Sequence, residues 1–419
     1  MDRRHFLRHM IGAGMTFPML DWVNGFHAAR AATGQTRGQS MILIWLSGGP
    51  STIDIWDLKP GTKNGGEFQP IQTTGSGQIC EHLPRLAKQM KHLSIIRSYT
   101  SRDGSHERGT YINHTAFAPV TSVIHPALGA VVAKYNTPGN LEVPGHISLG
   151  GPGVSPGFLG ASFSPFRVEA GSNPIPNIKS TVGIERLERR NTLLAKMQDT
   201  FVKQGRGELP GEHNTILNRA QELMSSKLLD SFKIDKISAA RREKFGDHTF
   251  GRNCLLASQL VEIGVPFIEV GLGGWDNHQD IFKALSDSPR ALLPQLDQGF
   301  GSLVEDLAER GLLESTTICC MGDFGRTPKI NQDTGRDHWP TGWSVVLGGG
   351  KIKGGEVVGA MSDDGAEIAD RPVDVSNLFA TLYESVGITS ATELRSPNGR
   401  PLKLVGTFGT GEPVREILS

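Results

Sequence analysis

The chain has 419 residues, with 43 basic residues against 43 acidic ones and therefore no formal net charge. Its length is enough to bury a large core in one or two domains, and the balanced charge argues against nucleic acid or an anionic membrane surface as a partner. Its four cysteines show no CxxC spacing, which argues against a zinc site built from thiolates.

The N-terminal segment, residues 1–34, differs from the rest of the chain. Arg3 and Arg4 precede Phe6 and Leu7, and a mildly apolar stretch then leads to the small residues of "HAARAATG". This layout is typical of a twin-arginine export signal; a basic amphipathic helix is the alternative. We therefore expect the twin-arginine export machinery as a partner and an exported, periplasmic location. We expect no membrane span after processing, because no other run approaches the roughly 18 apolar residues that a span requires.

From residue 40 onward, short β-branched runs alternate with longer amphipathic stretches. This alternation predicts an α/β fold, with a largely parallel sheet sandwiched by helices, as one domain over residues 40–405 and a C-terminal tail over residues 406–419. The predicted strands cover residues 41–47, 93–98, 145–150, 265–274, 315–322 and 343–349. The predicted helices cover residues 82–90, 125–135, 251–264, 288–313 and 374–388, the last with Asp374 as its N-cap.

The alternation stops between residues 184 and 247. Two long, charged helices are predicted there, over residues 184–204 and 213–232, with no strand between them. Such a pair indicates a helical insertion over the sheet, or a separate helical subdomain.

Polar side chains follow the first two predicted strands, and ligands of open α/β sheets collect at such strand ends. After the first strand, a turn leads to Ser51 and Asp54, which suit a nucleophile and a metal ligand, or equally a turn with a helix cap. After the second strand come Arg102 and His106. Arginine binds phosphate or sulfate oxygens and histidine binds a metal or donates a proton, although a solvated charged loop is the alternative.

The two strands later in the chain end in further candidate ligands. Asp276 and His278 are two residues apart, so in an extended segment they face the same side and can converge on one cation. Asp323 directly follows the apolar strand 315–322, and a carboxylate there needs a cation or an ion pair with Arg326 to offset its desolvation.

The loop "GRDHWP" brings further groups to the same edge. Arg336 is available for an anionic oxygen, and His338 offers an imidazole. The resulting carboxylate and imidazole set is typical of a divalent metal such as zinc, manganese or calcium. Its members are Asp54, Asp276, His278, Asp323 and His338.

The leader and the motifs "GGPS", "GEFQPI", "CLLASQLVEIGVPFIEV", "GWDNH", "GDFGRTP" and "GRDHWP" carry a resemblance. The chain resembles the alkaline phosphatase-like superfamily, and most closely its exported, sulfatase-like branch. The resemblance implies Ser51 as the nucleophile and Asp54 as the early metal carboxylate. It also implies a late group of metal ligands: Asp276, His278, Asp323 and His338. Phe324 stands where the superfamily usually has a histidine, and Thr52 stands where the branch often has one.

These observations predict an exported, metal-dependent hydrolase of a phosphate or sulfate ester, acting on a small molecule or a polysaccharide. Arg326, Arg336 or Arg102 would stabilise the charge on the transferred group, and His106 is a further catalytic candidate. The departures at Phe324 and Thr52 motivate the alternative, an exported binding or assembly protein that keeps the fold, with or without one metal, and catalyses nothing.

Overall fold

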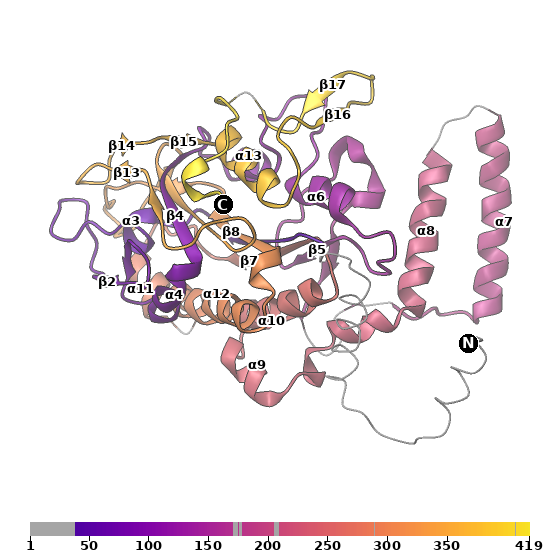
Figure 1. The fold of residues 1–419 in the computed structure, drawn as a ribbon, viewed down its shortest axis with the longest axis horizontal. Helices are drawn as coiled ribbons and strands as arrows, with labels where there is room; N and C mark the ends of the chain where they lie inside the picture. Colours follow the sequence, from indigo (N-terminus) through magenta and orange to yellow (C-terminus); the bar gives the residue numbers. More distant parts are fainter. Residues whose placement is uncertain (1–37, 171–174, 176–177, 205–208, 289, 407) are drawn as a thin grey trace. The chain divides into compact units, whose positions relative to one another are not determined.

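A computed structural model describes residues 38–419, apart from residues 171–174, 176–177, 205–208, 289 and 407 (Figure 1). The expected export signal over residues 1–34 lies outside the described residues. Residues 38–419 form one compact unit. Within the described ranges, no helix combines the length and the hydropathy that crossing a membrane requires.

The centre of the fold is a nine-stranded sheet in the order β12-β4-β11-β8-β1-β7-β5-β6, with β15 also paired to β4. Its strands are β1 (Ser40–Ser47), β4 (Leu93–Thr100), β5 (His146–Leu149), β6 (Phe166–Val168), β7 (Phe267–Gly273), β8 (Thr316–Gly322), β11 (Trp343–Gly348), β12 (Val357–Val358) and β15 (Val373–Asp374). Neighbouring strands are parallel except at β11, which runs antiparallel to both β4 and β8. The predicted α/β fold with a largely parallel sheet is confirmed.

The antiparallel return of β11 determines where the loop before it lies. Because β11 runs back along β8, the connection between them starts and ends at the edge where β8 ends. Within this loop, β9 (Gly325–Arg326) pairs with β10 (His338–Trp339), so that Arg326 lies opposite His338. The motifs "GDFGRTP" and "GRDHWP" are therefore two sides of one small ribbon.

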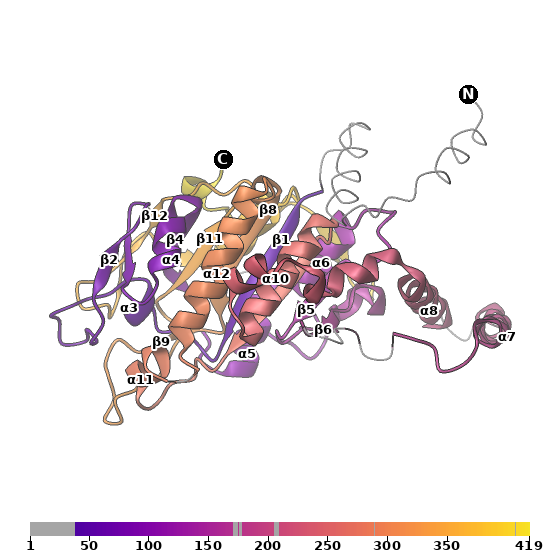
Figure 2. The ribbon, with the colours of Figure 1, turned by 90° about the horizontal axis from the view of Figure 1, so that it is seen from below.

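Helices cover both faces of the sheet (Figures 1 and 2). One face carries α10 (Thr249–Glu262) and α12 (Leu292–Glu309), and the other carries α6 (Leu128–Asn136) and α13 (Val375–Ser385). Strand β1 shows why the sequence folds this way, since its apolar side chains, from Met41 to Leu46, alternate between the two cores and are all fully buried. A strand buried on both faces reads as a continuous apolar run, which is what "MILIWL" is.

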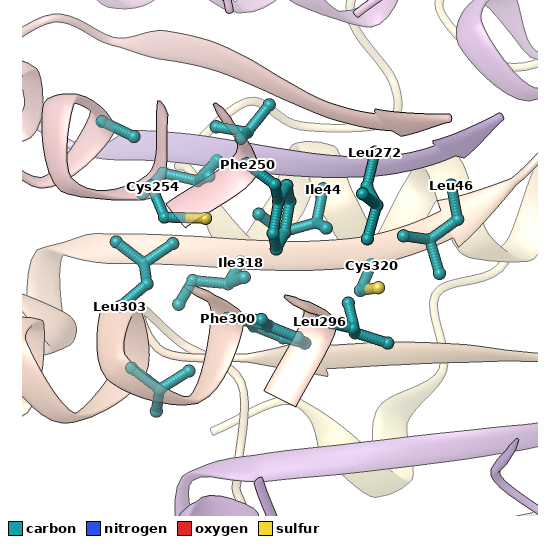
Figure 3. Close-up of a cluster of buried hydrophobic side chains, with 14 of the residues drawn as sticks. Ile44, Leu46, Phe250, Cys254, Leu272, Leu296, Phe300, Leu303, Ile318 and Cys320 are labelled. Carbon is teal, nitrogen blue, oxygen red and sulfur yellow. The ribbon is translucent and has the colours of Figure 1, made fainter. Parts of the chain in front are cut away.

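The core between the sheet and α10 and α12 is shown in Figure 3. Phe250 and Cys254 from α10 and Phe300 from α12 pack there against Ile44 and Ile318 from the central strands. Burial raises the pKa of the Cys254 thiol well above its ordinary value, so this cysteine behaves as a small apolar residue.

The remaining helices are α3 (Thr52–Ile55), α4 (Pro84–Gln89), α5 (His106–Thr115), α7 (Ile184–Lys203), α8 (Leu209–Ser225), α9 (Ala239–Phe245) and α11 (Ile281–Ser286). Short two-stranded sheets are formed by β2 (Pro70–Gln72) with β3 (Gln78–Cys80), β13 (Ala360–Met361) with β14 (Ile368–Asp370), and β16 (Glu393–Arg395) with β17 (Pro401–Lys403). Helices α7 and α8 lie side by side in the segment expected to form a helical insertion. In the segment expected to be a tail, Val414 and Ile417 are buried in the core beneath α13.

Helix α13 begins with a capping box. The Asp374 carboxylate accepts the backbone N–H groups of Ser376 and Asn377 at 2.8 and 3.1 Å, and the Asn377 side chain accepts the Asp374 N–H in return. The predicted N-cap is therefore confirmed.

We expect Asp374→Ala to lower the free energy of unfolding by about 0.5–2 kcal/mol, because two helix N–H groups lose their acceptor. Urea unfolding measures this loss, with the exposed Asp363→Ala as control; equal losses in the two variants would contradict the capping role.

Candidate metal centre

Loops from four strands meet at one edge of the sheet: those after β1, β4, β7 and β8. Two glycines permit their close approach. A Cβ on Gly48, which has φ of +114°, would lie 2.5 Å from the backbone nitrogen of Asp276. A Cβ on Gly335 would lie 2.0 Å from the carbonyl carbon of His278. Any larger residue at either position would push these loops apart.

Three histidines at this edge each direct Nδ1 at an oxygen acceptor. Nδ1 of His106 contacts Asp323 Oδ2 at 2.5 Å, and Nδ1 of His278 contacts Asp337 Oδ1 at 2.8 Å. Nδ1 of His338 contacts the carbonyl oxygen of Gly104 at 2.7 Å. A carboxylate or carbonyl oxygen accepts, so each Nδ1 donates, and in the neutral ring each Nε2 then presents a lone pair. Such orientation by carboxylates and carbonyls is typical of metal-binding histidines.

The three Nε2 atoms converge on the carboxylate of Asp276. Oδ1 lies 3.0 Å from Nε2 of His278 and 3.2 Å from Nε2 of His338, and Oδ2 lies 3.4 Å from Nε2 of His106. The Nε2 atoms of His278 and His338 are 3.1 Å apart. Nε2 of His106 is buried and has no hydrogen-bond partner within the described part of the chain. With all three rings neutral, these contacts bring acceptors against acceptors, and His278 Nε2 also accepts from Arg326 Nη1 at 3.3 Å.

The donor set fits a divalent cation. Ligands of tetrahedral zinc lie about 2.0–2.1 Å from the ion, which puts neighbouring donors about 3.3–3.4 Å apart. The separations of the three Nε2 atoms from Asp276, 3.0–3.4 Å, are close to that spacing, and the donors of His106, Asp276 and His338 all lie within 4.8 Å of one another. The charge of the cluster also suits a divalent cation. The carboxylates of Asp276, Asp323 and Asp337 outnumber the guanidinium that contacts them, that of Arg326, by two. Imidazole nitrogen with carboxylate oxygen suits zinc or manganese better than calcium, which takes oxygen ligands only.

Arg326 holds Asp276 in place. Its side chain is fully buried, and its five N–H groups are directed at Asp276 Oδ1, His278 Nε2 and the carbonyl oxygens of Gly48, Gly49 and Arg336. Burial works to raise the pKa of Asp276, but the hydrogen bond and charge of Arg326, helped by His338 and His106, hold it at about 2. Asp276 is therefore ionised and ready to bind a cation at any ordinary pH. Arg326 pairs with Asp276 rather than with the adjacent Asp323, and its N–H groups are not directed outward to a substrate.

His106 and Asp323 take different places from those expected. Asp323, expected as a ligand, lies behind His106, and its two oxygens accept from His106 Nδ1 and from the backbone N–H of Gly48 at 3.0 Å. His106, expected as a catalytic group, supplies an Nε2 to the cluster. The ring of Phe324 packs against the rings of His106 and His338, with centroids 4.8 and 4.4 Å apart.

Ser51, Asp54 and Arg336 also differ from the expected arrangement. Asp54 was expected to bind the metal and Arg336 to bind an anionic oxygen, but the two are partners in a fully buried ion pair. Arg336 Nε donates to Asp54 Oδ2 at 2.6 Å and Nη2 donates to Oδ1 at 2.8 Å. The hydroxyl of Ser51, the expected nucleophile, is buried and donates to Asp54 Oδ2 at 2.5 Å. Desolvation explains this pairing, because a buried carboxylate and a buried guanidinium each require a partner.

Sequence reasoning missed the role of Asp337, which orients His278 from the opposite side of the loop ribbon. The signal was present, because Asp337 directly precedes His338 in "GRDHWP". The role of the Gly104 carbonyl could not have been predicted in this way, because every residue type carries the same backbone acceptor.

Comparison with known families gives one match. Residues 38–418 match the model of a family described as "Protein of unknown function (DUF1501)". No curated protein matches the sequence.

Several solved structures share parts of the arrangement. A sulfatase from Pseudoalteromonas sp., PsFucS1, aligns with 15% identity and a TM-score of 0.37 over 89% of this chain and 72% of its own. A protein of the alkaline phosphatase superfamily from Vibrio parahaemolyticus aligns with 12% identity and a TM-score of 0.34, over 84% and 67%. A phosphonate monoester hydrolase from Silicibacter pomeroyi aligns with 11% identity and a TM-score of 0.36, over 87% and 76%. At these values the likeness says nothing about the substrate of this chain.

Proposed function

The chain belongs to the family described as "Protein of unknown function (DUF1501)", and from the chemistry of its strand-end cluster we propose that it is a metal-dependent hydrolase of phosphate or sulfate esters. The observation that carries the proposal is that the Nε2 atoms of three histidines lie 3.0–3.4 Å from the carboxylate of Asp276, and that the ligand atoms of His106, Asp276 and His338 all lie within 4.8 Å of one another. The side chains of these four residues are 28–49% exposed, so a substrate can reach them from solvent.

We assign the metal to His106, His278, His338 and Asp276. A divalent ion held there supplies Lewis acidity to a phosphoryl or sulfuryl oxygen. The surrounding residues keep the donors in place: Asp323, Asp337 and the Gly104 carbonyl fix the rings, and Arg326 fixes the carboxylate. We propose one ion rather than two, because the buried ring of Phe324 lies against two of the imidazoles where the superfamily pattern has a further ligand.

A cation from the protein must also meet the anionic ester. Arg326 and Arg336 direct their N–H groups at protein oxygens, so we assign this contact to Arg102. Arg102 is exposed and lies four residues before His106, in the loop that leads into α5. Its Nη2 donates to the carbonyl oxygen of Phe408 at 3.1 Å, a contact that leaves the charge of the guanidinium unneutralised.

We further propose that the protein acts outside the cytoplasm after export by the twin-arginine route. The support is the order of Arg3, Arg4 and the apolar residues that follow them. This route carries folded proteins, which suits a site assembled from four separate loops.

The test is reconstitution of the chelator-stripped full chain with zinc, manganese or calcium, followed by metal analysis and assays with p-nitrophenyl phosphate and p-nitrophenyl sulfate. We expect about one equivalent of zinc or manganese to bind and turnover of at least one ester to depend on it. A wild type that takes up none of the three ions would overturn the proposal.

A second candidate function is an exported binding or assembly protein that holds one metal without catalysing hydrolysis. Two observations favour it: the buried hydroxyl of Ser51 is already donated to Asp54, and Thr52 Oγ1 accepts the backbone N–H of Ser344 at 2.7 Å. The hydroxyl groups of Ser51 and Thr52 are thus both engaged in hydrogen bonds within the protein. Stoichiometric metal without turnover of either ester would select this candidate.

A further inference from the structure

A group of three buried polar residues, Ser51, Asp54 and Arg336, joins the end of β1 to the loop that carries His338. We propose that this Ser51–Asp54–Arg336 triad is a positioning device for the metal centre, and that Ser51 is a part of it rather than a nucleophile. The inference rests on the proposed metal site and assigns a role to residues outside its ligand set.

The first support is where Arg336 is anchored. Its guanidinium donates to both oxygens of Asp54 and to the carbonyl oxygens of Asn64, Thr327 and Pro328, so its N–H groups are satisfied by buried protein oxygens. Its neighbours in sequence are Asp337, which orients His278, and His338, which supplies an Nε2.

The backbone of Arg336 links the same parts of the site. Its N–H donates to the carbonyl oxygen of Asn277 at 3.1 Å, and its carbonyl oxygen accepts from Arg326 Nη1 at 3.0 Å. Asn277 lies between Asp276 and His278, and Arg326 holds Asp276. A shift of Arg336 would therefore move three of the four metal-binding side chains relative to His106.

The second support comes from a similar serine, aspartate and arginine group elsewhere in the molecule. Among α9, α10 and α12, Arg241 donates through Nε and Nη2 to the two oxygens of Asp306, both at 2.8 Å, and Ser258 donates to Asp306 Oδ2 at 2.5 Å. Arg310 joins this group by donating to Ser258 Oγ at 3.1 Å and Asp306 Oδ2 at 3.4 Å. The group connects three helices, and within the described part of the chain its hydrogen bonds do not reach the metal-binding side chains. A buried serine, aspartate and arginine group therefore holds packed elements together elsewhere in this chain.

The chemistry of Ser51 agrees with a structural role. A nucleophilic serine needs a base that can take its proton. Asp54 is a poor base for this purpose because both of its oxygens already accept from Arg336. The hydroxyl of Ser51 satisfies one remaining lone pair of a buried carboxylate, as Ser258 does at Asp306.

The experiment compares the two triads in the full chain. Asp54→Asn and Arg336→Lys are paired with Asp306→Asn and Arg241→Lys, and each protein is measured for zinc affinity by competition with a chromophoric chelator. The visible absorption bands of the cobalt(II)-substituted proteins report ligand geometry, and urea unfolding of the metal-free proteins reports stability.

We expect Asp54→Asn and Arg336→Lys to weaken zinc binding by about 10–100-fold, as losses of outer-shell partners do, and to shift the cobalt bands. Asp306→Asn and Arg241→Lys should lower the urea midpoint and leave zinc affinity and the cobalt bands unchanged. If the variants of the aspartates and arginines fail to fold, Ser51→Ala is compared with Ser258→Ala, which removes only a hydroxyl. We then expect a lower zinc affinity in Ser51→Ala alone.

Three outcomes would count against these proposals. A wild type that binds neither zinc nor cobalt overturns the proposed metal centre itself. A wild type that binds them, with affinities and cobalt bands unaffected in the Asp54 and Arg336 variants, overturns the positioning role alone. Ester turnover lost in Ser51→Ala, with zinc affinity and cobalt bands retained, would also overturn it by showing Ser51 to be a nucleophile.

Discussion

His338→Ala is expected to lower the zinc affinity of the full chain by more than the roughly 10–100-fold that loss of an outer-shell partner costs. Its Nε2 lies 3.2 Å from Asp276 Oδ1 and 3.1 Å from Nε2 of His278, so it contacts two of the other donors. Metal analysis and chelator competition measure the loss. The fold should survive, because the side chain of His338 is 28% exposed at a loop edge.

A matched control is His213→Ala, which removes an exposed imidazole on α8 whose partner is Gln198. Its zinc affinity should equal that of the wild type. Asp323→Asn should have a zinc affinity between those of His338→Ala and the wild type. An amide in place of the carboxylate can donate to His106 Nδ1, which moves the ring proton to Nε2, where it blocks coordination. Equal zinc affinity in His338→Ala, His213→Ala and the wild type would refute the site.

Glu269→Gln is expected to lower the free energy of unfolding by about 1–3 kcal/mol at pH 7, the range for removing one partner of a buried hydrogen bond. Glu269 lies in β7 at 1% exposure, with Oε1 3.0 Å from His114 Nε2 and Oε2 accepting the Gly153 N–H at 3.1 Å. Burial works to raise the pKa of Glu269, but the hydrogen bond and charge of His114, the charge of His146 and the Gly153 N–H together lower it.

The sign of the pH dependence follows from this lowered pKa. A carboxyl group whose folded pKa is below its unfolded value of about 4.3 contributes stability above that value and loses it as pH falls through the folded pKa. The difference in the free energy of unfolding between the wild type and Glu269→Gln should therefore be largest at neutral pH and become smaller below about pH 4. Urea unfolding of both proteins at several pH values measures this difference.

The control for this prediction is Glu305→Gln, which removes the charge from a partly exposed ion pair with Lys244. Such pairs contribute about 0–1 kcal/mol. A loss in Glu269→Gln no larger than the loss in Glu305→Gln, or a difference that does not change with pH, would show that the buried pair contributes little.

Much of the secondary structure could be predicted because it depends on local pattern. The apolar run over residues 41–47 became β1, and Asp374 became the N-cap of α13, since both signals lie within a few neighbouring residues. The helix expected over residues 288–313 is shorter, as α12 begins at Leu292 and ends at Glu309. The antiparallel direction of β11 had no local signal, because strand direction is set by pairing with distant segments.

The sequence by itself indicated that polar residues follow the strands of a parallel sheet, and it predicted Asp54, Asp276, His278, Asp323 and His338 as one set of ligands, with His106 as a catalytic candidate after the second strand. Only the tertiary structure decided which of these side chains meet: His106 joins Asp276, His278 and His338, and Asp54 does not. Asp54 and Arg336 are 282 residues apart, and no spacing rule reveals that they neutralise each other. The physical reason is desolvation: a buried charge takes whichever opposite charge the fold brings within reach, and that choice depends on long-range packing rather than on residue type.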